Sequence, residues 1–174
     1  TWIPDGKAQI YDKNKLLSHI ASDKNWAPGH QLRHIVTKLI KDKFEVDFWG
    51  SAFKEFDKED KYLCLKDYCF SITVMNAKNN NYFTETLIDA FRCGTVPIFW
   101  GCDNLGEYFN EKGVLRFNSP KELYDILEGL SFEKYKEMLP YVEENYRIAT
   151  SHTQLDDNVI QAIMSSISED QTDA

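Results

Sequence analysis

The sequence lacks the features of a membrane-spanning or disulfide-stabilised protein. Its longest apolar runs are a few residues, far below the ~20 that cross a bilayer as a helix. Its four cysteines form no C-x-x-C pair and have no histidine at zinc-ligand spacing. We therefore expect buried, reduced thiols. The sequence leaves the location open, but favours a soluble protein of a reducing compartment, the cytoplasm if the source is bacterial or viral.

Several catalytic motifs are also missing. There is no G-x-G-x-x-G or P-loop, which argues against a dinucleotide or kinase site, and no G-x-S-x-G nucleophile elbow. No D-x-D pair follows a strand. His30 and His34 share a helix face, but without an H-E-x-x-H motif they are a weak metal signal, and we expect neither a metal nor a cofactor.

What the chain does have is an ordinary globular composition. Its 174 residues are 43% apolar and 28% charged, enough for one domain with its own core. Twenty Lys and Arg against 28 Asp and Glu leave a net charge of −8. This acidity argues against a nucleic-acid partner, because such a protein needs a basic face. An anionic ligand would need a local site that opposes the field of the whole protein.

Strand-like and helix-like periodicities alternate along the chain. Strands are expected at 16–21, 44–49, 68–75, 95–100 and 114–117, and helices at 30–42, 82–93, from 119 onward, 131–147 and 155–168. This alternation predicts an α/β fold, a three-layer, Rossmann-like parallel sheet with right-handed crossovers. We assign 1–15 as an irregular lead-in, 16–168 as the domain and 169–174 as a polar tail. Because the chain opens on Thr1 in an aromatic-rich segment, we interpret it as a domain cut from a longer protein.

Two helix boundaries carry sharper predictions. For the helix 82–93, Asn81 is the expected N-cap and Gly94 the left-handed residue that follows its end. For the helix that follows strand 114–117, Ser119 is the expected N-cap and Pro120 the first helical residue.

Parallel sheets bind ligands beyond the carboxyl ends of their strands, and the loops 23–29 and 76–81 qualify. The helix after the second loop offers free N–H groups and a dipole to an anion such as phosphate. Tyr82, Glu85 and Thr86 lie in its opening turns, on the polar face that Asp89 continues. Glu85 would repel a phosphate but could accept hydrogen bonds from ribose hydroxyls. A solvated helix face after an Asn-rich turn explains the same pattern.

Arg33 is the candidate cation after the first loop. It falls in the first turn of the predicted helix 30–42, where the helix dipole disfavours a positive charge. An anionic partner is therefore expected, either a surface carboxylate or a bound phosphate, which the planar guanidinium fork can hold with two parallel hydrogen bonds.

The run YCFSITVMNAKNNNYFTETLIDAFRCGTVPIFWG, residues 68–101, resembles the donor-binding motif of the α-1,3-fucosyltransferases, glycosyltransferase family 10. That family has a strand ending in Phe/Ile-Glu-Asn, a polar loop, Tyr-Val/Phe-Thr-Glu-Lys opening a helix, and a Gly-x-(Val/Ile)-Pro-(Ile/Val) strand. The residues that match at the family's offsets are Asn76, Tyr82, Glu85, Gly94 and Pro97. Upstream, Arg33 takes the position of the family's phosphate-binding arginine.

The resemblance implies the C-terminal, donor-binding half of a GT-B glycosyltransferase. Its partners would be GDP-fucose as donor and a glycan acceptor, and the reaction would be an inverting, metal-independent transfer of fucose to a sugar hydroxyl. Arg33 and Tyr82 would hold the diphosphate, Glu85 the ribose, and Asn76 would line the nucleotide-sugar pocket. The catalytic residue stays unknown, because the family's general base belongs to an N-terminal domain that we do not find here. The fragment alone should be inactive.

Two positions depart from the family pattern: Met75 replaces a Glu, and Thr86 replaces the Lys after the matched Glu. Losing a charge-assisted contact to the diphosphate costs about 1.5–3 kcal/mol, roughly ten- to a hundredfold in donor affinity. Either Lys78 or Lys24 compensates from a nearby loop, or the donor binds weakly, or the donor is another nucleotide sugar. A divergent, non-catalytic α/β binding module is the remaining alternative.

Overall fold

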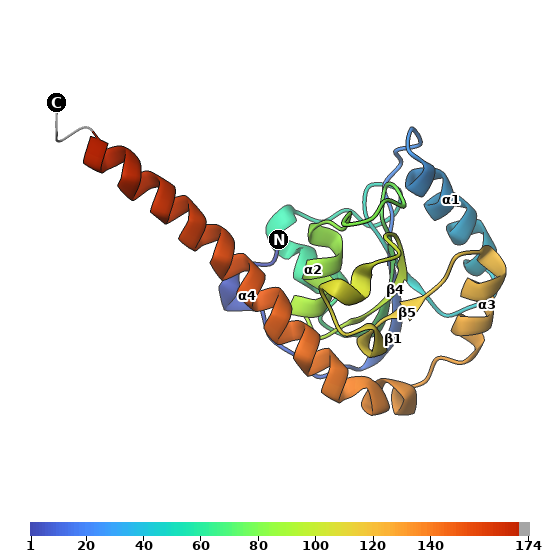
Figure 1. Ribbon diagram of the computed structural model, residues 1–174. Helices are drawn as coiled ribbons and strands as arrows, with labels where there is room; N and C mark the ends of the chain where they lie inside the picture. The colour runs from blue at the N-terminus through green and yellow to red at the C-terminus, as the bar shows by residue number, and fades with distance from the viewer. Residues whose placement is uncertain (171–174) are drawn as a thin grey trace.

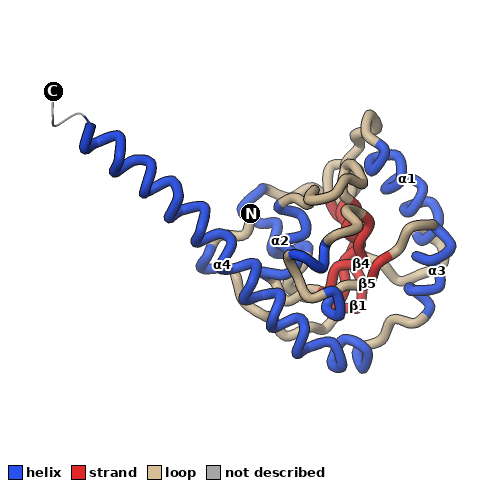
Figure 2. Tube along the Cα trace, in the orientation of Figure 1, coloured by secondary structure: helices blue, strands red, loops and turns tan. Residues whose placement is uncertain are grey.

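The computed structural model describes the backbone of residues 1–170 and the side chains of residues 1–151. A parallel five-stranded sheet forms its centre, in the order β2-β1-β3-β4-β5. The strands are β1 (Lys15–Ile20), β2 (Asp47–Trp49), β3 (Tyr68–Val74), β4 (Val96–Trp100) and β5 (Leu115–Arg116). Helices α1 and α3 cover one face, and α2 and α4 cover the other (Figures 1 and 2). The predicted three-layer α/β fold is confirmed.

The central strand β3 follows directly from its sequence. All seven of its residues are buried, as expected of a strand that is covered by helices on both faces. Pro97 of β4 pairs with Ser71 in the parallel register, so the strand keeps its place although proline donates no backbone hydrogen bond.

The helices are α1 (Pro28–Ile40), α2 (Glu85–Arg92), α3 (Pro120–Glu128) and α4 (Phe132–Asp170), with 3-10 turns at Asp5–Lys7, Lys58–Cys64, Leu105–Glu107 and Glu111–Gly113. The predicted start of α3 is confirmed, because the Ser119 hydroxyl accepts the Glu122 backbone N–H at 3.2 Å and Pro120 is the first helical residue. Gly94 adopts a left-handed φ of 65° after α2, also as predicted.

The predicted start of α2 is wrong. The helix begins at Glu85, and Thr84 is its N-cap, with a hydroxyl that accepts the Thr86 N–H at 3.4 Å. Asn81 instead takes a left-handed φ of 62°. Its side-chain oxygen accepts hydrogen bonds from Asn104 and Tyr108 at 2.6 and 2.8 Å. The hydroxyl that caps the helix therefore belongs to Thr84, three residues after Asn81, whose side-chain amide was the predicted cap.

Other boundaries shift too. Strand β2 pairs over three residues rather than 44–49, although Phe44 and Val46 pack on the core. The two helices predicted at 131–147 and 155–168 are one helix, α4, which includes residues 169 and 170 of the predicted tail. Residues 148–154 contain neither Gly nor Pro, so nothing interrupts α4 there. Residues 171–174 of the predicted tail lie outside the described residues.

The predicted lead-in 1–15 is irregular apart from one 3-10 turn and from Lys15, which begins β1, but it packs into the domain. Ile3 is 1% exposed and belongs to a hydrophobic cluster with Cys64, Leu65, Ala90 and Cys93. All four cysteines are free and buried, as predicted, and burial raises the pKa of the Cys64 and Cys93 thiols to about 12.

Candidate functional site

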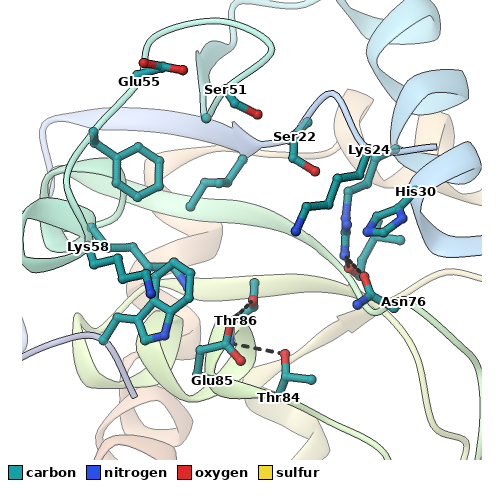
Figure 3. Close-up of a pocket in the computed structure, with 18 of the residues that line it drawn as sticks. Ser22, Lys24, His30, Ser51, Glu55, Lys58, Asn76, Thr84, Glu85 and Thr86 are labelled. Carbon is teal, nitrogen blue, oxygen red and sulfur yellow. Dashed lines mark hydrogen bonds between the residues drawn. The ribbon is translucent and has the colours of Figure 1, made fainter. Parts of the chain in front are cut away.

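A cavity of about 720 Å³ opens at the carboxyl edge of the sheet, where β1 and β3 lie side by side. From β1 the chain continues to β2 on one side, and β3 and β4 follow on the other. This is the topological switch point at which open parallel sheets bind ligands. The residues that face one another across it come from the loops after β1 and β2, from α1 and from the start of α2 (Figure 3).

Gly29 sets α1 against the end of β3. Its N–H donates to the Asn76 carbonyl at 3.0 Å, and a Cβ at this position would overlap the Met75 carbonyl oxygen. Only glycine permits this approach of two backbones. The contact places the next turn of α1, which carries Arg33, directly over the last residues of β3.

Arg33 binds to backbone and amide oxygens rather than to a carboxylate. Its Nε donates to the Val74 carbonyl at 3.1 Å, and its Nη2 donates to the same oxygen and to Asn76 Oδ1, the latter at 3.0 Å. Among the described residues it forms no ion pair. Burial lowers its pKa, against the opposing influence of Tyr82 and Glu85. The surface-carboxylate alternative is therefore not what the structure shows.

The position of Arg33 in its helix was predicted wrongly. Because α1 starts at Pro28, Arg33 lies in the second turn and not the first. The helix dipole therefore disfavours a cation at Arg33 less strongly than expected. The reason to expect a bound anion is instead that Arg33 forms no ion pair among the described residues.

Lys24 and His30 line the same side of the cavity as Arg33. Figure 3 shows the Lys24 side chain reaching into the cavity beside His30 and Asn76. Burial, together with the charges of Arg33 and Lys24, lowers the pKa of His30, so its imidazole is neutral at pH 7. The Ala27 N–H donates to its Nδ1 at 3.3 Å, which leaves the proton of the neutral ring on Nε2.

Residues at the start of α2 form another wall of the cavity. Thr84, Glu85 and Thr86 line it, and the Thr86 hydroxyl donates to Glu85 Oε1 at 3.4 Å. The Glu85 carboxylate offers acceptors for hydroxyl groups. The wall thus presents one negative charge and two hydroxyls, whereas the Arg33 side presents positive charge.

The structure brings four of the six predicted binding residues into the cavity: Arg33, Asn76, Glu85 and Thr86. The other two do not line it. Tyr82 packs with Phe83 against a hydrophobic cluster, although it is near enough to influence the pKa of Arg33. Lys78 pairs with Asp103 at 2.9 Å and donates to Asn118 at 2.8 Å.

Asp89 and Met75 are structural residues. Asp89 is fully buried on α2 and pairs with Lys61 at 2.8 Å. It also accepts hydrogen bonds from the Thr1 hydroxyl and from the Trp2 N–H, the latter at 3.0 Å. Met75 is 1% exposed in a hydrophobic cluster, so its departure from the family pattern changes packing and not the cavity lining.

The sequence analysis missed one wall of the cavity, which Trp2, Phe56, Lys58 and Lys61 contribute. The Lys61 Nζ lies 4.6 Å from the centre of the Trp2 ring, an arrangement in which a cation is attracted to an aromatic face. The aromatic residues of the first segment were the available signal, but no periodicity linked them to residues 56–61.

In the part of the chain that the structure describes, no three His, Cys, Asp or Glu side chains gather as a metal site. None of the described helices has the length and apolar character to span a membrane.

Residues 10–170 match the family model of the C-terminal domain of glycosyltransferase family 10 (fucosyltransferase). The chain belongs to this family. The family member 4-galactosyl-N-acetylglucosaminide 3-alpha-L-fucosyltransferase 9 of Mus musculus is 29% identical over 126 residues, which cover 69% of this chain and 34% of that protein. The alpha-(1,3)-fucosyltransferase FucT of Helicobacter pylori is 26% identical over 77 residues, 44% of this chain and 16% of that protein.

The solved structures agree with this placement. An alpha1,3-fucosyltransferase with GDP-fucose is 25% identical with a TM-score of 0.59, over 73% of this chain and 38% of that one. An alpha1,3-fucosyltransferase with GDP is 20% identical with a TM-score of 0.60, over 82% and 46%, and shows the shared fold. The expected likeness to the C-terminal half of a GT-B transferase is confirmed. The chain spans about a third of the length of the mammalian relatives it matches.

Proposed function

We propose that this chain binds GDP-fucose and forms the donor-binding half of an inverting fucosyltransferase. The observation that carries the proposal is Arg33, a guanidinium held at the switch point of the sheet without a carboxylate partner among the described residues. A cation that forms no ion pair among the described residues, in a cavity of about 720 Å³, suits the diphosphate of a nucleotide sugar. Family membership and the GDP-fucose in a structural relative support the choice of donor.

The cavity walls suit the other parts of such a donor. Glu85 would accept hydrogen bonds from the ribose hydroxyls, since a carboxylate that faced the phosphates would repel them. Asn76 accepts a hydrogen bond from Arg33 through Oδ1, which leaves its amino group as a donor for the ligand. Thr86 offers a hydroxyl at the same wall.

In the proposed reaction, a hydroxyl oxygen of the glycan acceptor attacks the anomeric carbon of fucose. The new C–O bond forms as the bond to the phosphate oxygen breaks, and GDP leaves with the electron pair. Arg33 stabilises the negative charge that develops on the diphosphate. The hydroxyl proton passes to a general base, which we propose lies in an N-terminal domain outside this chain, so the chain alone catalyses no transfer.

Calorimetric titration of the 174-residue chain with GDP, GDP-fucose, GDP-mannose and UDP-sugars tests the donor. We expect binding of the guanosine compounds, with GDP-fucose bound more tightly than GDP-mannose. Binding of uridine compounds alone would move the protein to another nucleotide sugar. Binding of none of them, together with no transfer by the full-length protein, would make it a non-catalytic binding module.

A further inference from the structure

The Arg33 side of the cavity carries two positive side chains that are not engaged in ion pairs among the described residues. Lys24 and Arg33 both line it, and neither forms an ion pair within residues 1–151. Asp23, the acid next to Lys24, is occupied elsewhere, because its Oδ1 accepts the Ser51 hydroxyl at 2.9 Å. In a protein with a net charge of −8, two cations on one side of a cavity that form no ion pair among the described residues suit a multiply charged anion.

The backbone holds Lys24 at this position. The His34 Nε2–H donates to the Lys24 carbonyl at 2.9 Å, which ties the loop after β1 to α1. Lys24 is exposed, and Figure 3 shows its side chain extending over the cavity that it lines. His30 lies between the loop and Arg33, and both positive charges contribute to its lowered pKa. The loop therefore presents the Lys24 amine from the same side as the Arg33 guanidinium.

We propose that Lys24 is a second phosphate-binding residue, which contacts the diphosphate together with Arg33 and supplies the positive charge that Thr86 lacks on α2. This inference rests on the proposed function and adds to it a chain-specific determinant of donor affinity. The loop between β1 and α1 and the start of α2 lie on different walls of the cavity. A cation on the loop can contact the same phosphates as a cation at position 86 would, so the site keeps the same number of positive charges.

The other lysines near the cavity are less suited to this role. Lys61 is 3% exposed and its amine is paired with Asp89, and Lys78 is paired with Asp103. Lys58 lines the cavity, but its amine lies 5.1 Å from the Trp2 ring centre, on the wall opposite Lys24 (Figure 3).

The test compares GDP affinity in the 174-residue chain and four variants by calorimetry. Lys24→Ala should weaken GDP binding roughly ten- to a hundredfold and flatten its dependence on salt, because one ionic contact is lost. Lys24→Ala combined with Thr86→Lys should recover most of that affinity. Lys38→Ala should stay within about twofold of the parent, because Lys38 lies exposed on α1 away from the cavity lining. Lys58→Ala compares the two walls and should weaken binding less than Lys24→Ala, because Lys58 lines the opposite wall.

The outcomes separate the inference from the function. If the parent chain binds GDP and Lys24→Ala binds it equally well, Lys24 has no role at the phosphates, while the proposed function stands. A loss in Lys58→Ala instead would assign the second cation to the opposite wall. If the parent chain binds no GDP, the proposed donor is wrong and the inference fails with it. Equal urea midpoints for all variants exclude a folding defect as the cause.

Discussion

Two cations that line the cavity, the buried Lys61 and the half-buried Arg33, differ in whether an acid pairs with them. Lys61 has a counter-charge, since Asp89 meets its amine at 2.8 Å with both side chains almost fully buried. Arg33 hydrogen-bonds to carbonyl and amide oxygens and forms no ion pair among the described residues, although Glu85 is near enough to act on its pKa. A buried charge whose neighbours neutralise it holds structure together, whereas one that the chain leaves unneutralised is available to a charged ligand. The contrast separates a structural cation from the proposed phosphate-binding one within a single cavity.

The first way to break the contrast is to remove the counter-charge of Lys61. Asp89→Ala should lower the free energy of unfolding by about 3–5 kcal/mol, because it leaves a buried ammonium without a partner. It also removes the acceptor for Thr1 and Trp2. Urea unfolding followed by circular dichroism measures the change. The double variant Lys61→Met/Asp89→Leu should regain part of the loss; a cost below about 1 kcal/mol for Asp89→Ala would mean that the pair is not structural.

His19 shows a third response to burial, which is to stay uncharged. It lies on β1 with no exposed surface, and burial lowers its pKa from 6.5 to about 4. Between these two pH values the unfolded chain binds more protons than the folded one. The free energy of unfolding should therefore fall by about 3 kcal/mol as the pH drops from 6.5 to 4.

Urea titrations across that pH range, run in parallel on the parent chain and on His19→Leu, isolate this contribution from that of the carboxylates. The parent chain should lose more stability than the variant on acidification. Parallel curves would show that His19 does not titrate as its burial indicates.

Arg33→Ala tests the cation that forms no ion pair within residues 1–151, in contrast to the paired Lys61. GDP affinity should fall at least about a hundredfold, because two charge-assisted hydrogen bonds to the diphosphate are lost. The free energy of unfolding should change by no more than about 1 kcal/mol, since the desolvation cost of the guanidinium disappears along with its hydrogen bonds. Calorimetry and urea unfolding together give both values. Unchanged affinity would remove Arg33 from the site.

The smallest effect is expected for Lys78→Ala. Its pair with Asp103 is partly exposed, with the acid 68% exposed, and such pairs contribute less than about 1 kcal/mol. GDP affinity should be unchanged, because Lys78 does not line the cavity. A tenfold loss of affinity in calorimetry would restore the binding role that its sequence position suggests.

Local patterns predicted the parts of the fold that depend on local physics. The all-apolar run of β3, the Ser119-Pro120 start of α3 and the left-handed Gly94 each depend on a few neighbouring residues, so they could be predicted. The N-cap of α2 could not be chosen between Asn81 and Thr84, because both side chains can cap a helix. The side-chain oxygen of Asn81 instead accepts hydrogen bonds from Asn104 and Tyr108, which are distant in the sequence.

The residues of the candidate site also divide into those that the sequence could predict and those that it could not. Arg33, Asn76, Glu85 and Thr86 could be predicted because the ends of parallel strands and the starts of the following helices meet at one edge of a sheet. Tyr82 and Lys78 were predicted from the same loop, but they turn toward a hydrophobic cluster and toward Asp103. The direction of a side chain that leaves a loop depends on partners that are far away in the sequence.

The order of residues along the chain thus determined the layered sheet, the edge at which the candidate cavity lies and the family to which the protein belongs, because all three follow from periodicity and short-range spacing. Only the folded molecule decided which charges are neutralised. Asp89 pairs with Lys61 and Asp23 accepts a hydrogen bond from Ser51, whereas Arg33 and Lys24 form no ion pair among the described residues. Whether two charged side chains form an ion pair depends on the distance between them in the folded protein, and the packing of strands and helices sets that distance.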